Sequence, residues 1–218
     1  ADNLSAMVKK VTSGATSALG RIKISGYDSS HLTSMVEKVT AGATSSLGKI
    51  KMDGYDAGDL SGMLEKVTAG ATAALGNIKM DGFSADNLST MVEKVTSGAT
   101  AALSRIQMNG FSSDNLTSMI ENVKTGAKGS LGKIKMEGYN PNNKPAGLEN
   151  SVNTGASKGL DKQPPMLKEI TAVKTPTSET TPSYVFNSNK SGNISYGGSC
   201  TSSTTTASIG TNTISFNT

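Results

Sequence analysis

Few residues in this chain of 218 could do chemistry, and none has the partners that catalysis needs. The sequence holds one cysteine, Cys200, and one histidine, His31. Cys200 lies in a Ser/Thr-rich tract with no histidine nearby to activate it as a nucleophile. We therefore expect either a thiol available for an intermolecular disulfide or one half of a disulfide whose partner is missing. His31 stands where equivalent segments carry Asp or Asn, which predicts an exposed residue in the first turn of a helix.

Two short segments have the composition of ligand-binding loops but not their order. Residues 52–60 combine aspartates with glycines, yet aligning them as a calcium loop puts Lys49 and Lys51 at ligand positions. Helix capping explains the same aspartates. The Gly-rich segment 98–104 lacks the lysine and the preceding strand of a phosphate-binding loop. No catalytic residue, metal ligand or cofactor is predicted.

Composition argues against two further classes of protein. Lys and Arg number 21 and Asp and Glu 17, a net charge of +4 without a basic run, and only 4% of residues are aromatic. Nucleic-acid binding usually needs a clustered basic face, often with aromatic residues that stack on bases, so we expect no nucleic-acid partner. No stretch of 18 apolar residues is present, so no membrane span is expected.

The dominant pattern is a 28-residue repeat that fills residues 1–140 with five nearly uninterrupted copies. A degenerate sixth copy stands at 151–160, after an insertion that contains Pro141 and Pro145. Apolar columns recur in register from copy to copy. The residues that we predict to form the core between stacked copies are Leu32, Met35, Val39, Leu47, Ile50, Leu60, Met63, Val67, Leu75, Ile78, Leu88, Met91, Val95, Leu103 and Ile106.

The pattern within one copy predicts two short helices. Leu88, Met91 and Val95 lie on one helical face, Ser84 is a candidate N-cap, and a second face follows Gly98. Glycine at a helix end supplies the left-handed backbone that other residues avoid, so Gly98 is predicted to separate the helices. One alternative is a single bent helix of about 20 residues followed by a short extended piece. The other is a continuous coiled coil, since four heptads also make 28 residues.

A single copy is too small to fold alone. It offers about nine apolar side chains, worth roughly 1.5–3 kcal/mol each when fully buried. Ordering its backbone costs roughly 1–2 kcal/mol per residue, which at least equals that gain. Neighbouring copies must cover the exposed face, so the predicted fold is mainly α, with tandem two-helix repeats stacked as a solenoid.

The composition changes after residue 140, where the helical pattern gives way. Residues 141–174 are predicted to hold the degenerate sixth copy and a linker. From 175 to 218 the chain is rich in Thr and Ser, and apolar residues alternate with polar ones, as at Tyr184 and Phe186. Short alternating strands between turns indicate a small β-sandwich.

Three segments of this tail, 181–186, 192–200 and 211–216, resemble the first half of a bacterial Ig-like domain. The 28-residue copies are similar to tandem repeats in predicted bacterial exported proteins. The resemblance implies an extracellular or cell-surface location in bacteria. It also implies further strands beyond this sequence, one with a second cysteine that could pair with Cys200. The β-sandwich is then incomplete, either because this chain is a fragment or because a neighbouring chain donates the missing strands.

These observations predict a non-enzymatic, extracellular structural scaffold or filament-forming protein. It would associate with itself, through repeat stacking or strand donation, or with a cell-surface component. The alternative is an adhesin-type binding module that recognises a surface peptide or glycan. Variation among the copies is chemically mild and falls mostly where the helices begin, which favours the scaffold.

Overall fold

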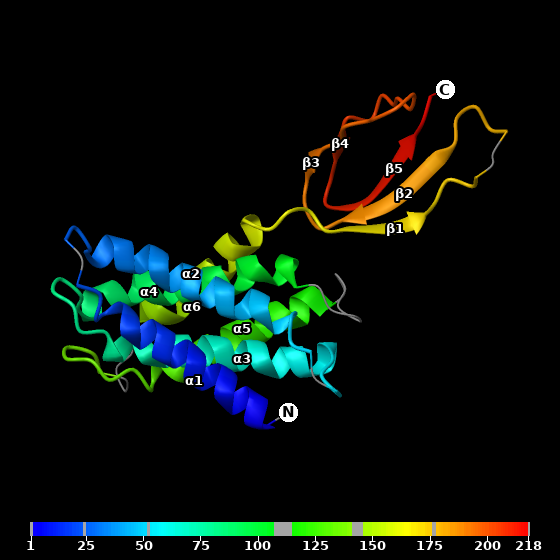
Figure 1. Cartoon of the computed structure of the whole chain (residues 1–218). Coiled ribbons are helices and arrows are strands. Elements are labelled where there is room, and N and C mark those ends of the chain that lie inside the picture. Colours follow the sequence, from blue (N-terminus) through cyan, green and yellow to red (C-terminus); the bar gives the residue numbers. More distant parts are fainter. Residues whose placement is uncertain are drawn as a thin grey trace. The chain divides into compact units, whose positions relative to one another are not determined.

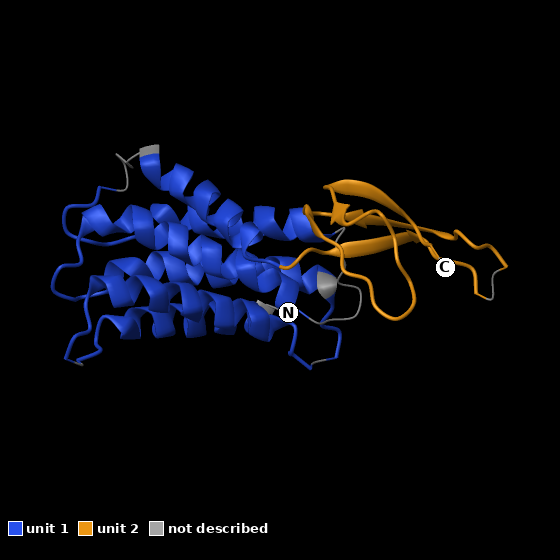
Figure 2. Cartoon of the chain, turned by 90° about the horizontal axis from the view of Figure 1, so that it is seen from above, with its two compact units in different colours: residues 1–163 blue, residues 164–218 orange. Residues whose placement is uncertain are grey.

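The chain forms two compact units, Ala1–Gln163 and Pro164–Thr218, which are coloured separately in Figure 2. The structure is a computed structural model, and it describes residues 2–23, 25–51, 53–106, 115–140, 146–175 and 178–217.

In the described part of the first unit, each copy of the repeat forms one α-helix, and the degenerate copy forms a sixth (Figure 1). Short 3₁₀ turns extend or precede some of the helices. The helices are α1 (Asp2–Leu19), α2 (Ser29–Leu47), α3 (Ala57–Ala74), α4 (Leu88–Ala102), α5 (Leu116–Leu131) and α6 (Ala146–Asp161); the 3₁₀ turns are η1 (Leu75–Asn77), η2 (Ala85–Asn87) and η3 (Leu103–Arg105).

The prediction of two short helices per copy is therefore wrong. Gly98 lies inside α4 and Gly42 inside α2, and both helices continue through the glycine. The single helix followed by an extended piece is the alternative that the structure supports. Glycine inside a helix costs about 1 kcal/mol relative to alanine, and tertiary packing can override a cost of that size. The continuous coiled coil is also excluded, because the described connections between the helices are not helical.

Side chains at the helix starts confirm the predicted caps. The Asp56 carboxylate accepts hydrogen bonds from the backbone N–H groups of Gly58 and Asp59, and the Asp59 side chain accepts one from the Asp56 N–H, which completes a capping box. Ser84 caps its turn in the same way with Asn87. The aspartates of segment 52–60 that are described at this helix start thus have a structural role.

The helices are arranged in two layers. Connections between successive helices alternate between the two ends of the unit, so neighbours in sequence run antiparallel and helices two apart run parallel (Figure 1). The closest packing joins the helices that are two apart: α1 with α3, α2 with α4, α3 with α5, and α4 with α6. Odd-numbered helices thus form one layer and even-numbered helices the other.

A continuous cluster of buried apolar side chains runs through both layers from α1 to α6. It starts with Leu19 at the end of α1 and reaches Leu148 and Val152 in α6. No helix could bury its apolar face alone, and stacking supplies the cover. The predicted stacked arrangement of a mainly α fold is confirmed at this level.

The connections between helices also stack two copies apart. A Cβ atom on Gly20 would lie 2.8 Å from the backbone nitrogen of Lys79, and one on Gly76 would lie 2.5 Å from that of Lys135. Gly82 and Gly138, near the ends of such connections, have φ angles of 76° and 77°, where other residues are strained. Gly20 and Gly76 therefore leave no room for a side chain where these connections pack against each other.

The second unit contains two small antiparallel sheets. One has the strand order β1-β2-β5 and the other pairs β3 with β4. The strands are β1 (Leu167–Thr171), β2 (Ser183–Ser188), β3 (Gly192–Asn193), β4 (Thr206–Ala207) and β5 (Gly210–Ser215). Phe186, Ala207 and Ile214 form its buried centre. The β content of this segment was predicted, and its coarse form is confirmed.

The glycine column yields the first testable prediction. Replacing Gly98 with Ala puts a Cβ within 3.0 Å of the Glu37 carbonyl, which should destabilise unit 1 by about 1–3 kcal/mol through overpacking. Gly42→Ala is the matched control, because Gly42 occupies the same column but has nothing within 4 Å. There the alanine should stabilise the protein by up to about 1 kcal/mol.

Urea unfolding followed by circular dichroism measures both free energies of unfolding. Equal effects at the two positions would show that glycine serves helix flexibility rather than close packing.

Candidate functional site: the interface between alternate helices

Two faces of every helix make the repeated interface. The front face of a helix meets the helix two copies earlier, and it carries the Met, Val, Gly and Ala columns, as in Met63, Val67, Gly70 and Ala71 of α3. The back face meets the helix two copies later and carries two Thr columns four residues apart.

Glycine sets the distance between the faces. A Cβ on Gly70 would lie 2.6 Å from the backbone oxygen of Lys9 in α1. The same column repeats this approach in later helices, always against the residue one turn before the first back-face threonine. The further pairs are Gly98 with Glu37, Gly126 with Glu65 and Gly155 with Glu93. No side chain fits between the two backbones at these points, so only glycine allows this separation.

Burial of the front face depends on whether an earlier helix covers it. Met63 and Val67 in α3 are 1% and 0% exposed, whereas Met7 and Val11 at the same columns of α1 are 60% and 68% exposed. Met35 and Val39 in α2 are half-buried. The open front face therefore lies on α1 and partly on α2.

Threonine makes the back face compatible with burial. Thr12, Thr40, Thr68 and Thr96 are fully buried, and each hydroxyl donates to the carbonyl four residues earlier in its own helix at 2.9–3.0 Å. This bond satisfies the hydroxyl within the helix and leaves the methyl group for the partner. The second Thr column, which includes Thr72 and Thr100, is equally buried.

Polar contacts across the interface help to fix the lengthwise alignment of one helix against the other. Ser61 in α3 donates to the Met119 sulfur of α5 at 3.4 Å, and Ser5 in α1 donates to the Met63 sulfur of α3 at 3.5 Å. Both pairs are 58 residues apart. The same bond at the same spacing shows that one interface is built twice.

Glu37 in α2 is a carboxylate with partners in other helical copies. It accepts hydrogen bonds from Ser97 at 2.9 Å and Lys94 at 3.3 Å, both in α4, and from Lys162 just after α6. Its side chain is 19% exposed, so these ion pairs are partly shielded from water. Glu37 thus links three helices of one layer.

Two opposing effects act on the Glu37 carboxyl group. Partial burial alone would raise its pKa, but the hydrogen bonds from Lys162 and Ser97 and the charge of Lys162, together with Lys94, outweigh burial and lower the pKa below its ordinary value. The group is therefore ionised at neutral pH and stabilises the layer as an anion.

The back face changes character in the last two helices. Both Thr columns become lysine in α5, at Lys124 and Lys128, and become Asn153 and Ser157 in α6. Lys124 pairs with Glu121 of its own helix at 2.7 Å, and Asn153 and Ser157 are exposed. We call these four residues the polar cap. Unlike the threonines of α1 to α4, they present hydrophilic groups on the side where a later helix would pack.

The structure places most of the predicted core residues in the interior. Met35 and Val39 are half-buried, because no earlier helix covers the front face of α2, and Ile50, in the connection after α2, is half-buried as well. The predicted core residues that are buried are Leu32, Leu47, Leu60, Met63, Val67, Leu75, Ile78, Leu88, Met91, Val95, Leu103 and Ile106.

The predicted candidates for chemistry are all at the surface. His31 is exposed in the first turn of α2, and its Nδ1 lies 2.8 Å from the Asp28 carboxylate that caps this helix. Hydrogen bonds from Ser30 and His31 hold the pKa of Asp28 well below its usual range. Cys200 is an exposed free thiol. The described residues contain no cluster of His, Cys, Asp and Glu suited to a metal ion.

Sequence reasoning overlooked the back face. The Thr columns are polar and are absent from the predicted core, and so is Glu37. One signal was present: the two Thr columns change together, to Lys124 and Lys128 in the fifth copy. A joint change at positions four residues apart marks a helical face with a different environment.

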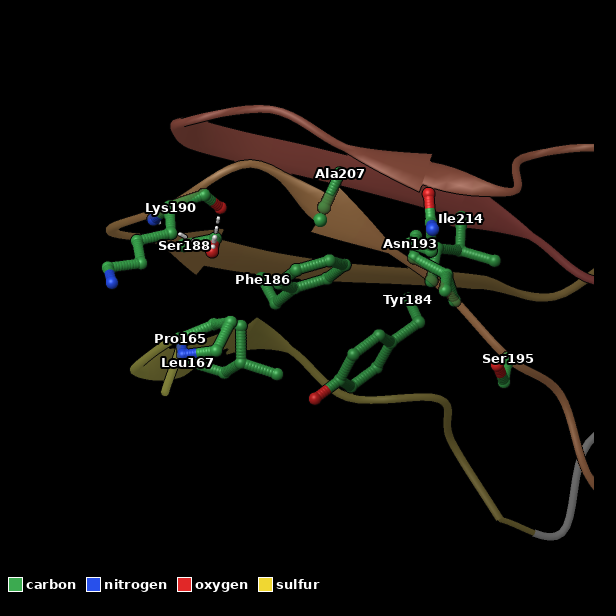
Figure 3. Close-up of a pocket in the computed structure, with 12 residues that line it drawn as sticks. Pro165, Leu167, Tyr184, Phe186, Ser188, Lys190, Asn193, Ser195, Ala207 and Ile214 are labelled. Atoms are coloured by element: carbon green, nitrogen blue, oxygen red, sulfur yellow. Dashed lines mark hydrogen bonds between the residues drawn. The ribbon is translucent and has the colours of Figure 1, made fainter. Parts of the chain in front are cut away.

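The second unit has an apolar pocket of about 320 Å³ (Figure 3). Tyr184 and Phe186 of β2, Ile214 of β5 and Ile194 line it, with Leu167 of β1 at one side. Tyr184 and Phe186 are stacked, with ring centroids 5.8 Å apart. Leu167 and Ile170 of β1 are exposed, and β1 is an edge strand that pairs with β2 among the described strands.

No helix in the described parts of the chain has the length and apolar character needed to cross a membrane.

Glu37 provides the second testable prediction. Glu37→Gln should destabilise unit 1 at neutral pH, because the partners in α4 and beyond α6 lose their anion. A lowered pKa in the folded state means that this stabilisation is present above the unfolded pKa and is lost as pH falls through the folded pKa. The difference between wild type and variant should therefore shrink below about pH 4.5.

Denaturant unfolding at a series of pH values gives this difference. Glu121→Gln is the control, because Glu121 occupies the same column but is 63% exposed and pairs only within its helix. A Glu37→Gln variant as stable as the Glu121→Gln variant at neutral pH would contradict the role of Glu37.

Comparisons with known proteins identify no relative of this chain: no protein-family model, curated protein sequence or solved structure matches it. The resemblance of the tail to bacterial Ig-like domains is thus not supported by a family match and stays a prediction.

Proposed function

We propose that this protein is a non-enzymatic structural scaffold in which the helical copies form a stiff spacer and the β unit makes contact with other chains. One observation carries the proposal. The columns that recur from copy to copy are the columns that pack: Met, Val, Gly and Ala on the front face and Thr on the back face. Repetition that serves packing is typical of architecture rather than catalysis.

The polar groups of the first unit support the same function. Glu37 is occupied by cross-helix partners, and the acids at the helix starts are occupied by backbone N–H groups. These side chains hold helices in place.

Self-association through the second unit is the second part of the proposal. All five residues of β1 are exposed, with Leu167 at 64% and Ile170 at 53%, and the apolar pocket lies beside this strand. An edge strand can pair with a strand of another chain, and the pocket offers room for the apolar side chains of that strand. A location at the bacterial cell surface remains part of the proposal on the strength of the resemblance alone.

End-to-end stacking of identical helical units is a less favourable route. It would place the polar cap, which includes Lys124 and Lys128, against the apolar front face of α1. Burying a lysine ammonium group costs more free energy than burying a threonine hydroxyl at the same column.

Sedimentation velocity over a range of protein concentrations tests the proposal. The natural chain should associate, and the double variant Leu167→Lys and Ile170→Lys should stay monomeric, because two charges would lie at the pairing edge. Val11→Glu on the front face of α1 is the matched control and should leave the association unchanged.

Other results would contradict the proposal. A chain that stays monomeric at all concentrations and binds one glycan or peptide saturably would be an adhesin instead. Association that is lost in the Val11→Glu variant would show that the helices, not the β unit, form the contact.

A further inference from the structure

The front face of α1 is an interface without its partner. Met7 and Val11 are 60% and 68% exposed, and nothing lies within 4 Å of a Cβ built on Gly14. Ala15 and Ala18, on the same face, are exposed as well. Gly42 in α2 is equally free, so the open face spans one helix in each layer. Two exposed apolar side chains next to two small ones form a patch of the kind that marks binding surfaces.

The same columns show what this face binds. In α3, α4 and α5 the front face is buried against the back face of the helix two copies earlier, and α6 repeats the glycine approach. Every one of these partners presents two buried threonines four residues apart and a backbone carbonyl one turn before the first. The internal interface thus occurs four times with a single type of partner.

We infer that the open front face of α1 and α2 is a docking surface for a pair of helices with this chain's own repeat sequence, whose Thr columns are intact. The polar cap on α5 and α6 has the opposite effect, because it prevents further helices from packing on the other side of the array. The array therefore has a direction: it accepts helices at α1 and α2 and refuses them at α5 and α6.

A second copy of this chain does not fit the open face. Its buried threonines are covered by its own later helices, and its free back face carries Lys124, Lys128, Asn153 and Ser157. Its lysine side chains would lie where the internal interfaces have threonine methyl groups, close to Gly14 of α1, where the two helix backbones would come closest. The occupant must therefore be helices of this repeat without the polar cap.

The test extends the full chain by a copy of residues 57–112 placed directly before Ala1, which keeps the 28-residue phase. The added helices supply intact Thr columns. In a Cys200→Ser background, Val11→Cys reports on the front face of α1. The extension should slow labelling of this thiol by about tenfold or more, because a buried thiol reacts only when the helix opens.

Two matched controls test the chemistry of the surface. Gly14→Leu should restore fast labelling in the extended chain, while it leaves labelling of the natural chain unchanged, because nothing surrounds Gly14 there. An extension that carries the polar cap in its added copy (Thr68→Lys, Thr72→Lys, Thr96→Asn and Thr100→Ser) should give no protection. Circular dichroism checks that each added pair is helical.

Three results would overturn the inference. Labelling of the extended chain could be as fast as that of the natural chain, the capped extension could protect equally well, or the natural chain could already be protected in a concentration-dependent way by a second copy. The inference rests on the helix packing and narrows the proposed scaffold function. Labelling at concentrations where the chain is monomeric separates its failure from a failure of self-association through β1.

Discussion

The close approach of a glycine to a backbone carbonyl two copies earlier is the constraint on which the helical unit depends. At Gly70, Gly98, Gly126 and Gly155 the two backbones leave no room for a Cβ. Glycine makes each helix intrinsically less stable than alanine would. It also lets the Met and Val columns on the front face of one helix reach the back face of the other. Burial of those columns, the stacked connections and the links from Glu37 follow from this distance. The repeat of 28 residues therefore encodes a contact between copies that are not adjacent in sequence.

This contact joins faces that differ, and so the array has a direction. If both faces of a helix were identical, a stack could grow from either side. Because the front face packs against threonines, replacing the threonines on the last helices prevents further helices from adding there. Lys124 and Lys128 do so with charge, and Asn153 and Ser157 with exposed polar groups. Repeat proteins need polar terminal copies to stay soluble, and the last two helices meet that need at one end. The exposed Met7 and Val11 at the other end show that the front face of α1 lacks such protection.

Much of the fold could be predicted from the sequence, because period and apolar columns are local patterns. The number of copies, the capping by Ser84 and Asp56, and the β content of the tail follow from residue types a few positions apart. Glycine was misleading, since Gly98 has the same local signature whether it ends a helix or packs against another one. The alternation of layers was not predictable either, because near-identical copies give no local clue about which pairs touch. The back face was missed because threonine is polar, although its hydroxyl bonds within its own helix.

Disulfide trapping between alternate helices tests the packing scheme most directly. Ser89 in α4 and Ser151 in α6 have their hydroxyl oxygens 2.7 Å apart, and cysteine is nearly isosteric with serine. In a Cys200→Ser background, Ser89→Cys with Ser151→Cys should form a disulfide rapidly and without loss of stability. Ser89→Cys with Thr117→Cys, which places the second thiol at the same column in the next copy, should not. A Ser89→Cys/Ser151→Cys variant that folds but forms no disulfide under oxidising conditions would contradict the packing of alternate helices.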